Sequence, residues 1–459
     1  MDLNDLPRIS IAGLGKLGSP LAAVLAAKGF PVIGLDLNER YVDAINAGVA
    51  PVQEPRLQEF IDRGRANLRA TTSYDAAISN SDLTFVVVPT PSDKEEMFTN
   101  KYVVEAVNSI GRSLRQKSTR HVVAITSTVM PSATGGAIKD ALESASDRAV
   151  GPLLGLAYNP EFIALGSVIK DMLEPDFILI GESDRDTGDL LQRIYTLVCE
   201  NKPLVKRMNF VNAEMAKIAV NTFVTTKISY ANMLAEMCDK LPGADVDVVT
   251  AAIGSDTRIG NRYLRGAIGY GGPCFPRDNK AFAALGRKIG ARCDIAEATD
   301  RINDRQIERL VAAIRPAVSA GARVTLLGLS YKPDTEVIEE SQGVALARYL
   351  SSEGYLVTTY DPLATPAAET ALADRVHFAS SLSKAIANAD AIVITTPWPE
   401  FKELPFDEAF VSERSLVVID PWRIVNVSML PKGANIIYLG QGARSGARQR
   451  QLRVVAKSS

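Results

Sequence analysis

The sequence predicts an α/β protein in which two doubly wound domains are joined by a long central helix and a helical dimerisation region. Two observations carry this prediction. Short apolar runs of strand length alternate with helical segments toward both ends of the chain. Between them, residues 213–241 contain neither glycine nor proline, which is typical of one long helix. We expect an N-terminal domain over residues 1–202, a central helical domain over 203–300, a C-terminal α/β domain over 301–441 and a mobile tail over 442–459.

Size and composition narrow the class of protein. A chain of 459 residues suits about three domains of ~150 residues each. The composition is 46% hydrophobic and 23% charged with a formal net charge of −2, which excludes a disordered or fibrous chain. No block of basic residues is present, so we expect no nucleic-acid partner. No stretch approaches ~18 consecutive apolar residues and the first residues lack a signal-peptide pattern, so we expect no membrane partner and a cytoplasmic protein.

The first elements follow in order from the sequence pattern. Residues 8–13 form an apolar run, the helical segment 19–29 ends on a glycine, and residues 31–36 form a second apolar run. This order is typical of a βαβ unit. Further strands are expected at 83–91, 121–128 and 176–181. Helical segments separate these strands, which predicts a parallel sheet.

The last part of the chain repeats this pattern, with strand-like runs at 322–330 and 355–362. The segments NSDLTFVVVPTP (80–91) and NADAIVITTPWP (388–399) each place a polar pair before a buried strand and a proline-rich turn. We therefore expect two similar α/β domains, with ligands in the cleft between them, outside the carboxyl ends of the strands.

A glycine-rich turn separates the first predicted strand from the first helix. Gly13, Gly15 and Gly18 form a G-x-G-x-x-G pattern, and Asp36 ends the second strand. In a Rossmann-like dinucleotide site, the first glycine permits a tight turn, the second lets the backbone approach a pyrophosphate, and the third lets the helix pack on the strand. Asp36 can accept hydrogen bonds from a ribose 2′-hydroxyl, which favours NAD over NADP. The alternative is a βα turn that binds no ligand.

A second informative segment is GYGGPCFPRD (269–278), which holds Cys274 in a loop fixed by glycine and proline, beside Arg277 and Asp278. A neighbouring cation favours the thiolate, the nucleophilic form of cysteine. The other cysteines lie in apolar segments and are expected to fill the core: Cys199, Cys238 and Cys293. With only two histidines and no C-x-x-C or H-x-x-x-H spacing, we expect no metal site.

A cofactor that accepts hydride and a thiol nucleophile together indicate oxidation to the level of a carboxylic acid. An aldehyde loses hydride only after a nucleophile adds to it, and a cysteine adduct supplies the required tetrahedral carbon. Lys217 and Asn221 are four residues apart on the predicted long helix, so they share a face and can point toward one developing alkoxide. An ordinary solvated helix face is the alternative for this pair.

Seven motifs resemble one family over most of the chain, up to about residue 435. They are GLGKLG (13–18), VPTP (88–91), STV (127–129), NPEF (159–162), AEMAKIAVNTF (213–223), DTRIGNRYLRGAIGYGGPCFPRD (256–278) and GLSYKPDT (328–335). On these motifs the chain resembles the nucleotide-sugar 6-dehydrogenases. Phe275 after the cysteine, and the RIGN run before it, look more like the UDP-glucose 6-dehydrogenase branch than the GDP-mannose or UDP-N-acetylhexosamine branches.

The resemblance implies two successive NAD-dependent oxidations of a sugar C6 alcohol to a carboxylate, by a homodimer or larger assembly. It implies that Cys274 forms the thiohemiacetal and the thioester, Lys217 and Asn221 stabilise the oxyanion, and Asp278 transfers protons with a water. Thr128 and Glu161 are implied to position and activate the hydrolytic water, and Arg258 to reach the sugar of the neighbouring subunit. The implied NAD-binding residues are Gly13, Gly15, Lys16, Leu17, Gly18, Asp36, Pro89, Thr90, Ser127 and Thr128. The implied nucleotide-sugar residues are Glu161, Phe162, Lys217, Asn221, Arg258, Tyr263, Arg265, Gly271, Tyr331, Lys332 and Arg423.

The chain departs from the family pattern at three places. Leu165 stands where a glutamate is usual, Glu339 stands where an arginine is usual, and the late arginine is displaced to Arg423, after Trp422. Loss of both partners of a charge pair is tolerable, whereas loss of one is costly. We therefore expect retained activity with an altered hold on NAD. The alternatives are the same chemistry on another nucleotide sugar, such as TDP-glucose, GDP-mannose or a UDP-N-acetylhexosamine, and a catalytically silent protein that binds NAD or a nucleotide sugar.

Overall fold

The computed structural model describes residues 6–406 and 416–443. The chain forms two compact units, Met1–Val220 and Asn221–Ser459. One helix, α9 (Phe210–Lys240), begins in the first unit and ends in the second. The 31-residue helix confirms the long helix expected from the run without glycine or proline.

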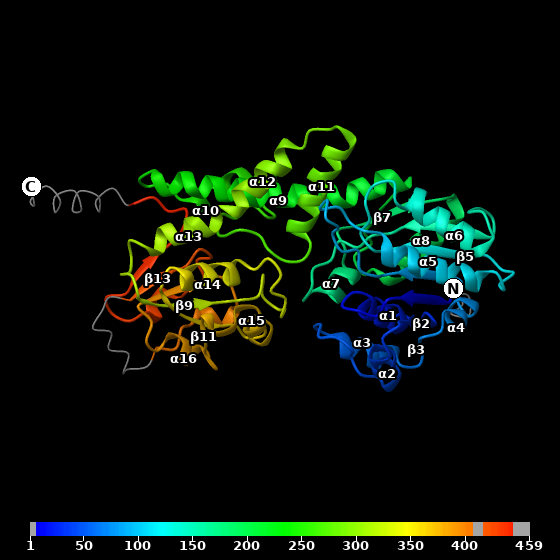
Figure 1. Ribbon diagram of the computed structural model, residues 1–459, viewed down its shortest axis with the longest axis horizontal. Coiled ribbons are helices and arrows are strands. Elements are labelled where there is room, and N and C mark those ends of the chain that lie inside the picture. The colour runs from blue at the N-terminus through cyan, green and yellow to red at the C-terminus, as the bar shows by residue number, and fades with distance from the viewer. Residues whose placement is uncertain (1–5, 407–415, 444–459) are drawn as a thin grey trace, which may run out of the picture. The chain divides into compact units, whose positions relative to one another are not determined.

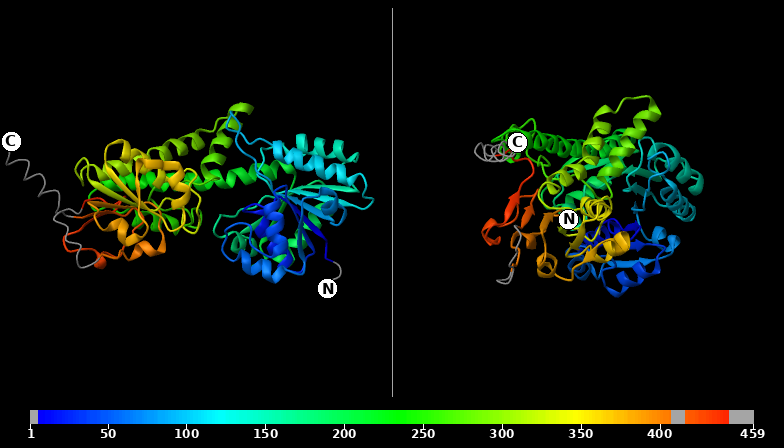
Figure 2. Two further views of the ribbon diagram at one scale, coloured as in Figure 1. Left: turned by 60° about the horizontal axis from the view of Figure 1, so that its bottom comes forward. Right: turned by 60° about the vertical axis from the view of Figure 1, so that its left-hand side comes forward.

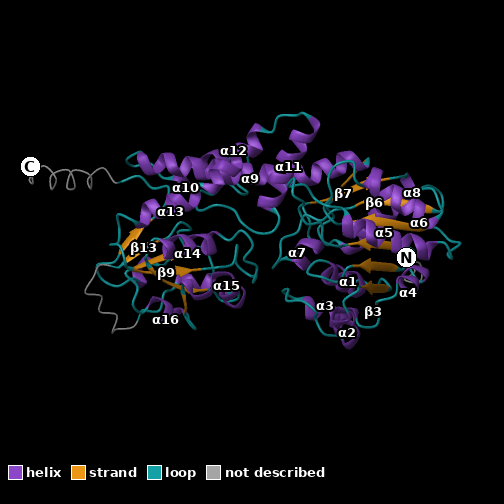
Figure 3. Cartoon of the chain, viewed as in Figure 1, coloured by secondary structure: helices purple, strands orange, loops and turns teal. Residues whose placement is uncertain are grey.

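The first unit contains an eight-stranded sheet with the order β3-β2-β1-β4-β5-β6-β7-β8 (Figures 1 and 3). The strands are β1 (Ile9–Ala12), β2 (Val32–Leu35), β3 (Leu68–Thr71), β4 (Leu83–Val86), β5 (His121–Ile125), β6 (Leu154–Tyr158), β7 (Phe177–Glu182) and β8 (Leu204–Met208). The order reverses beside β1, which lies between β2 and β4. In a doubly wound sheet, ligands bind outside the carboxyl ends of the strands at such a reversal.

Two features of this sheet differ from the sequence prediction. β7 runs antiparallel to β6, where a fully parallel sheet is expected. The segment between them contains the six-residue helix α7 and is about as long as the segment that joins the parallel strands β1 and β2, so its length alone does not decide the direction of β7. In addition, β8 pairs with β7, so the first sheet extends beyond the expected domain boundary at residue 202. The partly exposed sequence LVKRM of this edge strand lacks the apolar pattern of a buried strand.

Helices cover both faces of the first sheet (Figure 1). They are α1 (Gly18–Ala27), α2 (Glu39–Ala47), α3 (Leu57–Gly64), α4 (Tyr74–Ser79), α5 (Lys101–Leu114), the π-helix η2 (Thr134–Ile138), α6 (Lys139–Ser146), α7 (Val168–Leu173) and α8 (Arg185–Val198). β5 contributes Val122 and Ala124 to the core on one face, and Val123 and Ile125 to the core on the other. This alternation buries the strand on both faces, so it reads as a continuous apolar run.

The second unit begins within α9 and continues through four helices, α10 (Val246–Gly254), α11 (Phe275–Ile289), α12 (Asp294–Asp304) and α13 (Gln306–Ile314). The expected boundary at residue 300 falls inside α12. A helix cut at that point would leave backbone groups of one turn unpaired on either side.

A six-stranded parallel sheet with the order β11-β10-β9-β12-β13-β14 follows (Figure 2). Its strands are β9 (Arg323–Leu327), β10 (Leu356–Tyr360), β11 (His377–Phe378), β12 (Ala391–Ile394), β13 (Val417–Ile419) and β14 (Asn435–Ile437). The helices of this domain are α14 (Gln342–Ser352), α15 (Thr365–Leu372) and α16 (Leu382–Ile386), with short 3₁₀ turns η3 (Ala373–Arg375), η4 (Pro399–Lys402) and η5 (Val427–Met429). The two domains are therefore both doubly wound, as the sequence predicts.

The internal repeat extends to individual contacts. β4 and β12 occupy the same place in their sheets, beside β1 and β9. Arg8 donates to Asp82 before β4 at 2.7 Å, and Arg323 donates to Asp390 before β12 at 3.0 Å. The polar residues that precede each buried strand thus tie it to the first strand of its own sheet. This confirms the repeat seen in NSDLTFVVVPTP and NADAIVITTPWP.

The described chain ends close to α10. Gly442 donates its backbone N–H to Ala244, and Gly243 donates to Ala443. The first two residues of the expected mobile tail are therefore held, and the rest of the tail lies outside the described residues. Within the described ranges, no helix is long and apolar enough to cross a membrane.

Candidate active site

The glycine turn after β1 has the geometry that a bound dinucleotide requires. Gly13 has a φ of +105°, and a Cβ added there meets Val87 O at 2.2 Å. A Cβ at Gly18 meets Gly13 O at 1.8 Å, because α1 starts against the turn. A Cβ at Gly15 meets nothing within 4 Å. Gly13 and Gly18 are thus demanded by the fold itself, whereas the fold does not demand Gly15.

Open space above Gly15 fits a pyrophosphate approaching the N-terminus of α1. The first turn of α1 carries no acidic residue, so it does not repel an anion. Lys16 is exposed and Leu17 half-buried in the same turn. Asp36 accepts the backbone N–H of Leu14 at 2.6 Å and that of Asn38 at 2.8 Å. Carboxylate oxygens have further lone pairs, so the half-buried Asp36 retains capacity for a ribose hydroxyl.

Alanine substitutions of Gly18 and Gly15 distinguish a role in folding from a role in NAD binding. Gly18→Ala is expected to lower the free energy of unfolding of the first domain by about 1–3 kcal/mol, because the new methyl group overlaps a backbone carbonyl. Gly15→Ala is expected to leave the unfolding temperature unchanged and to weaken NAD binding about tenfold or more. Thermal unfolding and NAD titration calorimetry measure the two effects. Equal NAD affinity of Gly15→Ala and the unsubstituted protein contradicts the pyrophosphate assignment.

The loops after β4 and β5 are hydrogen-bonded to one another. Thr90 Oγ1 donates to Thr128 O at 2.7 Å, and Ser127 Oγ accepts the backbone N–H of Val88 at 2.9 Å. Thr90 and Ser127 are buried, while Pro89 is exposed. These four expected NAD-loop residues, Pro89, Thr90, Ser127 and Thr128, therefore lie together at the carboxyl ends of adjacent strands.

A buried carboxylate that the sequence analysis missed holds the same loop from the other side. Glu214 on α9 accepts the backbone N–H of Ser132 at 2.6 Å and that of Thr134 at 2.7 Å. Ser132 has a φ of +77°, a conformation that non-glycine residues rarely adopt. Glu214 lies three residues before Lys217, on the same face of the helix, and this spacing is the sequence signal that could have found it.

Lys217 lies inside the first unit rather than on a solvated face. Its side chain is buried, its Nζ donates to Glu161 O at 2.5 Å, and it lies 4.4 Å from the centre of the Phe162 ring. The solvated-face alternative is therefore wrong for Lys217. Burial raises the pKa of the Glu161 carboxyl group, against the opposing effects of a Tyr195 hydrogen bond and the Lys217 charge. The segment NPEF thus brings Glu161 and Phe162 to the lysine.

Asn221 lies one helical turn beyond Lys217 on α9, in the second unit. Its Nδ2 donates to Asp278 Oδ2 at 2.6 Å. Asp278 is buried on α11, and Arg277 donates to its other oxygen, Oδ1, at 3.1 Å. One carboxylate therefore joins the amide of α9 to the cation that follows the cysteine. The second unit brings together three of the residues selected from sequence.

Cys274 is the N-cap residue of α11, and it is exposed. The N-terminus of a helix favours a thiolate over a thiol, because the free N–H groups stabilise negative charge. Cys199 and Cys238 are buried, which confirms them as core residues, and Cys293 is half-buried. Cys274 alone among the four thiols combines exposure with a helix N-terminus. Among the described residues, no three His, Cys, Asp or Glu side chains are grouped so as to hold a metal ion.

The loop before the cysteine packs against the loop after β9. A Cβ at Gly271 meets Glu340 O at 2.3 Å, and a Cβ at Gly272 meets the Tyr331 ring at 2.6 Å. Gly272 also donates its N–H to Glu339 O at 2.9 Å. The glycines thus allow the GYGGPC and SYKPDT segments to touch. Tyr331 and Lys332, expected at the sugar diphosphate, are both half-buried in this second loop.

The remaining expected sugar-binding residues fall into two groups. Tyr263 and Arg258 are exposed, and Tyr263 meets the Phe275 ring edge-on at 6.2 Å. Arg258 pairs with Asp256 at 2.6 Å. Arg265 and Arg423 contact other parts of the second unit instead. Arg265 donates to Trp422 O, and Arg423 pairs with Asp245 at 2.6 Å and with Asp247 at 3.1 Å.

The pairing of Arg423 with two carboxylates joins its loop to the start of α10. Its side chain is only 16% exposed, so in this structure it serves the fold.

The two positions that depart from the family pattern also have local partners. Leu165 packs on the apolar core of the first unit, and the Glu54 carboxylate accepts the N–H groups of Gly166 and Val168 at 2.9 Å each. Glu339 is exposed, and its backbone oxygen supports Gly272. A leucine at 165 is therefore accommodated by packing, and the glutamate at 339 needs no buried cation.

Comparison with known proteins places the chain in one family. The UDP-glucose/GDP-mannose dehydrogenase family matches in three consecutive parts: its NAD binding domain over residues 7–199, its central domain over 211–305 and its UDP binding domain over 325–427. UDP-glucose 6-dehydrogenase AglM of Haloferax volcanii is 38% identical over 422 residues, which cover 91% of this chain and 97% of that protein.

Two further relatives are similar over most of their length. GDP-mannose 6-dehydrogenase of Pseudomonas putida is 33% identical over 418 residues, which cover 86% of this chain and 92% of that protein. A solved UDP-glucose dehydrogenase from Pyrobaculum islandicum matches with a TM-score of 0.85 at 31% identity, over 95% of this chain and 98% of that one. The chain therefore belongs to the UDP-glucose/GDP-mannose dehydrogenase family, the NAD-binding nucleotide-sugar dehydrogenases.

Proposed function

We propose that this protein is a UDP-glucose 6-dehydrogenase, which oxidises the C6 alcohol of UDP-glucose to the carboxylate of UDP-glucuronate through a cysteine-bound intermediate. The observation that carries the proposal is the exposed Cys274 thiol at the N-terminus of α11, near the Asn221–Asp278 hydrogen bond on the same helix pair. Two NAD molecules, bound one after the other, would each accept one hydride.

The C6 alcohol loses its hydroxyl proton and a hydride from carbon 6, and becomes an aldehyde. The Cys274 thiolate adds to the carbonyl carbon, and the oxyanion takes a proton to give a thiohemiacetal. Loss of a second hydride and of that hydroxyl proton gives a thioester. Water then attacks the thioester carbon, the carbon–sulfur bond breaks, and the carboxylate and the thiolate are released with two protons.

Lys217 and Asn221 stabilise the oxyanion, because an ammonium and an amide on adjacent turns of α9 donate hydrogen bonds where negative charge develops. Asp278 accepts hydrogen bonds from Asn221 and Arg277, and its carboxylate relays protons through a water. Thr128 positions the hydrolytic water and Glu161 takes its proton. Burial raises the pKa of Glu161, which makes its carboxylate a stronger base toward the hydrolytic water.

The glycine turn, Asp36 and the two loops after β4 and β5 hold NAD. On the sugar side, Phe162, Tyr263, Arg265, Gly271, Tyr331 and Lys332 bind the nucleotide sugar. Arg423 stays in this set only as an indirect support, since Asp245 and Asp247 occupy its guanidinium. We expect Leu165 and Glu339 to alter the affinity for NAD without abolishing turnover. Absence of NADH formation at every NAD concentration refutes that expectation.

The nucleotide base and the sugar are the least constrained part of the proposal. The similar proteins include a UDP-glucose and a GDP-mannose dehydrogenase. Thymine differs from uracil by one methyl group, which a pocket discriminates by only about 1–3 kcal/mol. A panel of UDP-glucose, TDP-glucose, GDP-mannose and UDP-N-acetylhexosamines identifies the substrate through the NADH formed per sugar consumed. Two NADH from one sugar support the four-electron reaction, whereas none from any sugar favours a silent binding protein.

We also propose a homodimer with a shared active site. Phe223, Tyr230 and Met237 are exposed on α9 by 67%, 47% and 54%, and their spacing of seven residues places them on one helix face. Such an apolar stripe suits a second copy of the same helix. The exposed Arg258 then reaches the sugar of the neighbouring subunit.

Complementation tests the shared site. Arg258→Ala and Cys274→Ser are each expected to be inactive, whereas co-expressed chains are expected to regain activity, because a mixed dimer contains one site with both residues intact. Phe223→Glu in both chains should abolish the regain by separating the subunits, which sedimentation velocity reports. Absence of any regain from a verified mixed dimer contradicts an Arg258 role across the interface.

A reactive thiol needs a reducing compartment, and all four cysteines are free. We therefore place the protein in the cytoplasm.

A further inference from the structure

Three polar side chains meet inside the first unit at a place that the sequence did not reveal. Tyr195 on α8 is buried, and its hydroxyl donates to Asn159 Oδ1 at 2.7 Å and to Glu161 Oε1 at 3.0 Å. A phenol carries one proton, so it can donate to one of these two acceptors at a time. Asn159 and Glu161 therefore compete for the Tyr195 proton.

Asn159 is a fixed competitor, because its other contacts orient it. Its Nδ2 donates to Leu179 O at 3.0 Å and its backbone N–H donates to Ile125 O at 2.8 Å. The side chain is buried, so its Oδ1 atom faces the phenol without exchange with solvent. The Asn159 amide oxygen therefore accepts the phenol's hydrogen bond for part of the time, and Glu161 accepts it for the remainder.

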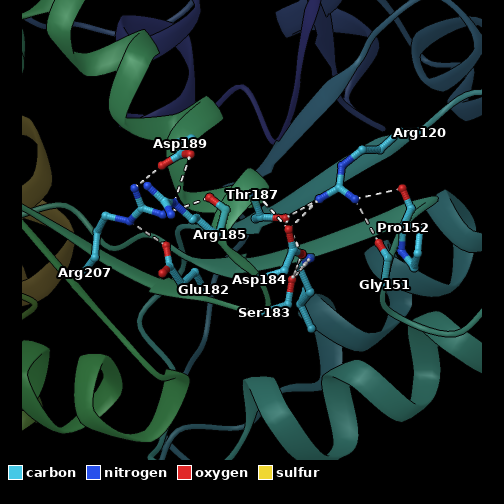
Figure 4. A network of polar contacts seen from close by, with 11 residues as sticks. Arg120, Gly151, Pro152, Glu182, Ser183, Asp184, Arg185, Thr187, Asp189 and Arg207 are labelled. Atoms are coloured by element: carbon cyan, nitrogen blue, oxygen red, sulfur yellow. Dashed lines mark hydrogen bonds and ion pairs between the residues drawn. The ribbon is translucent and has the colours of Figure 1, made fainter.

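The position of Tyr195 is equally fixed, because polar contacts anchor the start of α8 (Figure 4). Asp184 caps the helix by accepting the Thr187 N–H at 3.0 Å, and Arg120 donates to Asp184 at 2.9 Å. Arg207 from β8 donates to Glu182 at 2.7 Å and to the backbone oxygen of Arg185 at 2.8 Å. The helix therefore presents Tyr195 from a rigid support.

The groups that face Glu161 come from two helices. Burial raises the pKa of Tyr195 well above its usual value, so the phenol remains a donor. Burial also raises the pKa of Cys199, one turn further along α8, to about 12, so this thiol is neutral. Lys217 on α9 adds a positive charge. Among these groups Tyr195 alone donates a hydrogen bond to the Glu161 carboxylate.

We propose that Tyr195 is a positioning residue that divides one hydrogen bond between Asn159 and Glu161 and so sets the pH at which Glu161 becomes an active base. The proposal rests on the function proposed above for Glu161 in thioester hydrolysis. A hydrogen bond to the carboxylate favours the ionised form, and Asn159 limits this effect. The pair keeps Glu161 orientated while leaving it basic enough to accept a proton from water.

Two substitutions are expected to shift the protonation of Glu161 in opposite directions. Tyr195→Phe removes the donor, so the acid limb of the kcat profile, measured where hydrolysis limits turnover, should move up by about one pH unit. Asn159→Leu removes the competitor, so the phenol donates to Glu161 alone and the acid limb should move down. Cys199→Ala, one turn away on α8, is the matched control and should leave the limb in place. Shifts of both substitutions in the same direction overturn the proposal.

Infrared difference spectroscopy of the carboxyl band, assigned with Glu161→Gln, measures the same titration without turnover. Tyr195→Phe should raise the midpoint of this titration even if Asn159→Leu fails to fold, and an unchanged midpoint overturns the proposal. A shifted infrared midpoint with an unchanged acid limb of the kcat profile supports the hydrogen bond but refutes Glu161 as the base of hydrolysis. The two measurements thus separate a failure of this inference from a failure of the proposed function.

Discussion

Cys274→Ser is expected to reduce steady-state NADH formation by about 10³-fold or more, because a serine hydroxyl is far less nucleophilic than a thiolate near neutral pH. The effect should fall on kcat, since the residue is exposed at the N-terminus of α11 and the substitution hardly changes side-chain volume. The unfolding temperature and the NAD affinity should stay unchanged. NADH absorbance at saturating sugar and NAD measures the loss.

The matched control is Cys293→Ser. Like Cys274, this thiol belongs to the N-cap residue of a helix, α12, but it is half-buried beside Gly286 and its Sγ lies 3.7 Å from Phe282 O. We expect its substitution to preserve both NADH formed per sugar and kcat. Full multi-turnover activity of Cys274→Ser refutes the nucleophile. Activity that stops at one NADH per sugar instead shows that the first oxidation proceeds without the thiol.

Lys217→Met is expected to reduce kcat by about 10²- to 10³-fold, the typical cost of removing one donor to a developing oxyanion. Methionine keeps the unbranched apolar stem of lysine, but the contact of the Lys217 ammonium with the Phe162 ring is lost. Loss of the ammonium also removes the hydrogen bond to Glu161 O, and a modest loss of stability should accompany the kinetic effect. Steady-state kinetics and urea unfolding measure the two effects separately.

Lys240→Met on the last turn of the same helix is the control. The Lys240 side chain is 74% exposed and pairs only with Glu236, so its substitution should change neither kcat nor stability measurably. If Lys217→Met raises the sugar KM while kcat stays constant, the lysine binds ground-state substrate and its role at the oxyanion is wrong.

Local sequence patterns predicted those parts of the site that lie within one supersecondary unit. The glycine turn and Asp36 belong to one βαβ unit of about 30 residues, where Gly13 and Gly18 answer steric needs of their own neighbours. Lys217 and Asn221 lie on one helix, and Cys274 and Asp278 on one loop and helix start. In all these cases the spacing along the chain fixes the spacing in space.

The contacts missed from the sequence join residues far apart in the chain. Glu214 holds Ser132 across 82 positions, and Tyr195 reaches Glu161 across 34. Residue 195 lies in a helical segment whose apolar pattern predicts only burial. A hydroxyl on such a face is indistinguishable from core packing until the opposite strand end is known. The direction of β7 and the membership of β8 in the first sheet have the same origin, because strand pairing is a non-local property.

The sequence by itself determined the two doubly wound domains, the long helix, the dinucleotide turn and the choice of Cys274 among four thiols. Each of these rests on periodicity or on residue types within one local segment. Only the tertiary structure decided that Lys217 is buried against Glu161, that Arg423 is held by Asp245, and that Asn159 and Glu161 share the Tyr195 proton. Each of these contacts depends on which polar groups are buried together. Burial depends on packing between segments that are distant in the chain, so the order of residues does not reveal it.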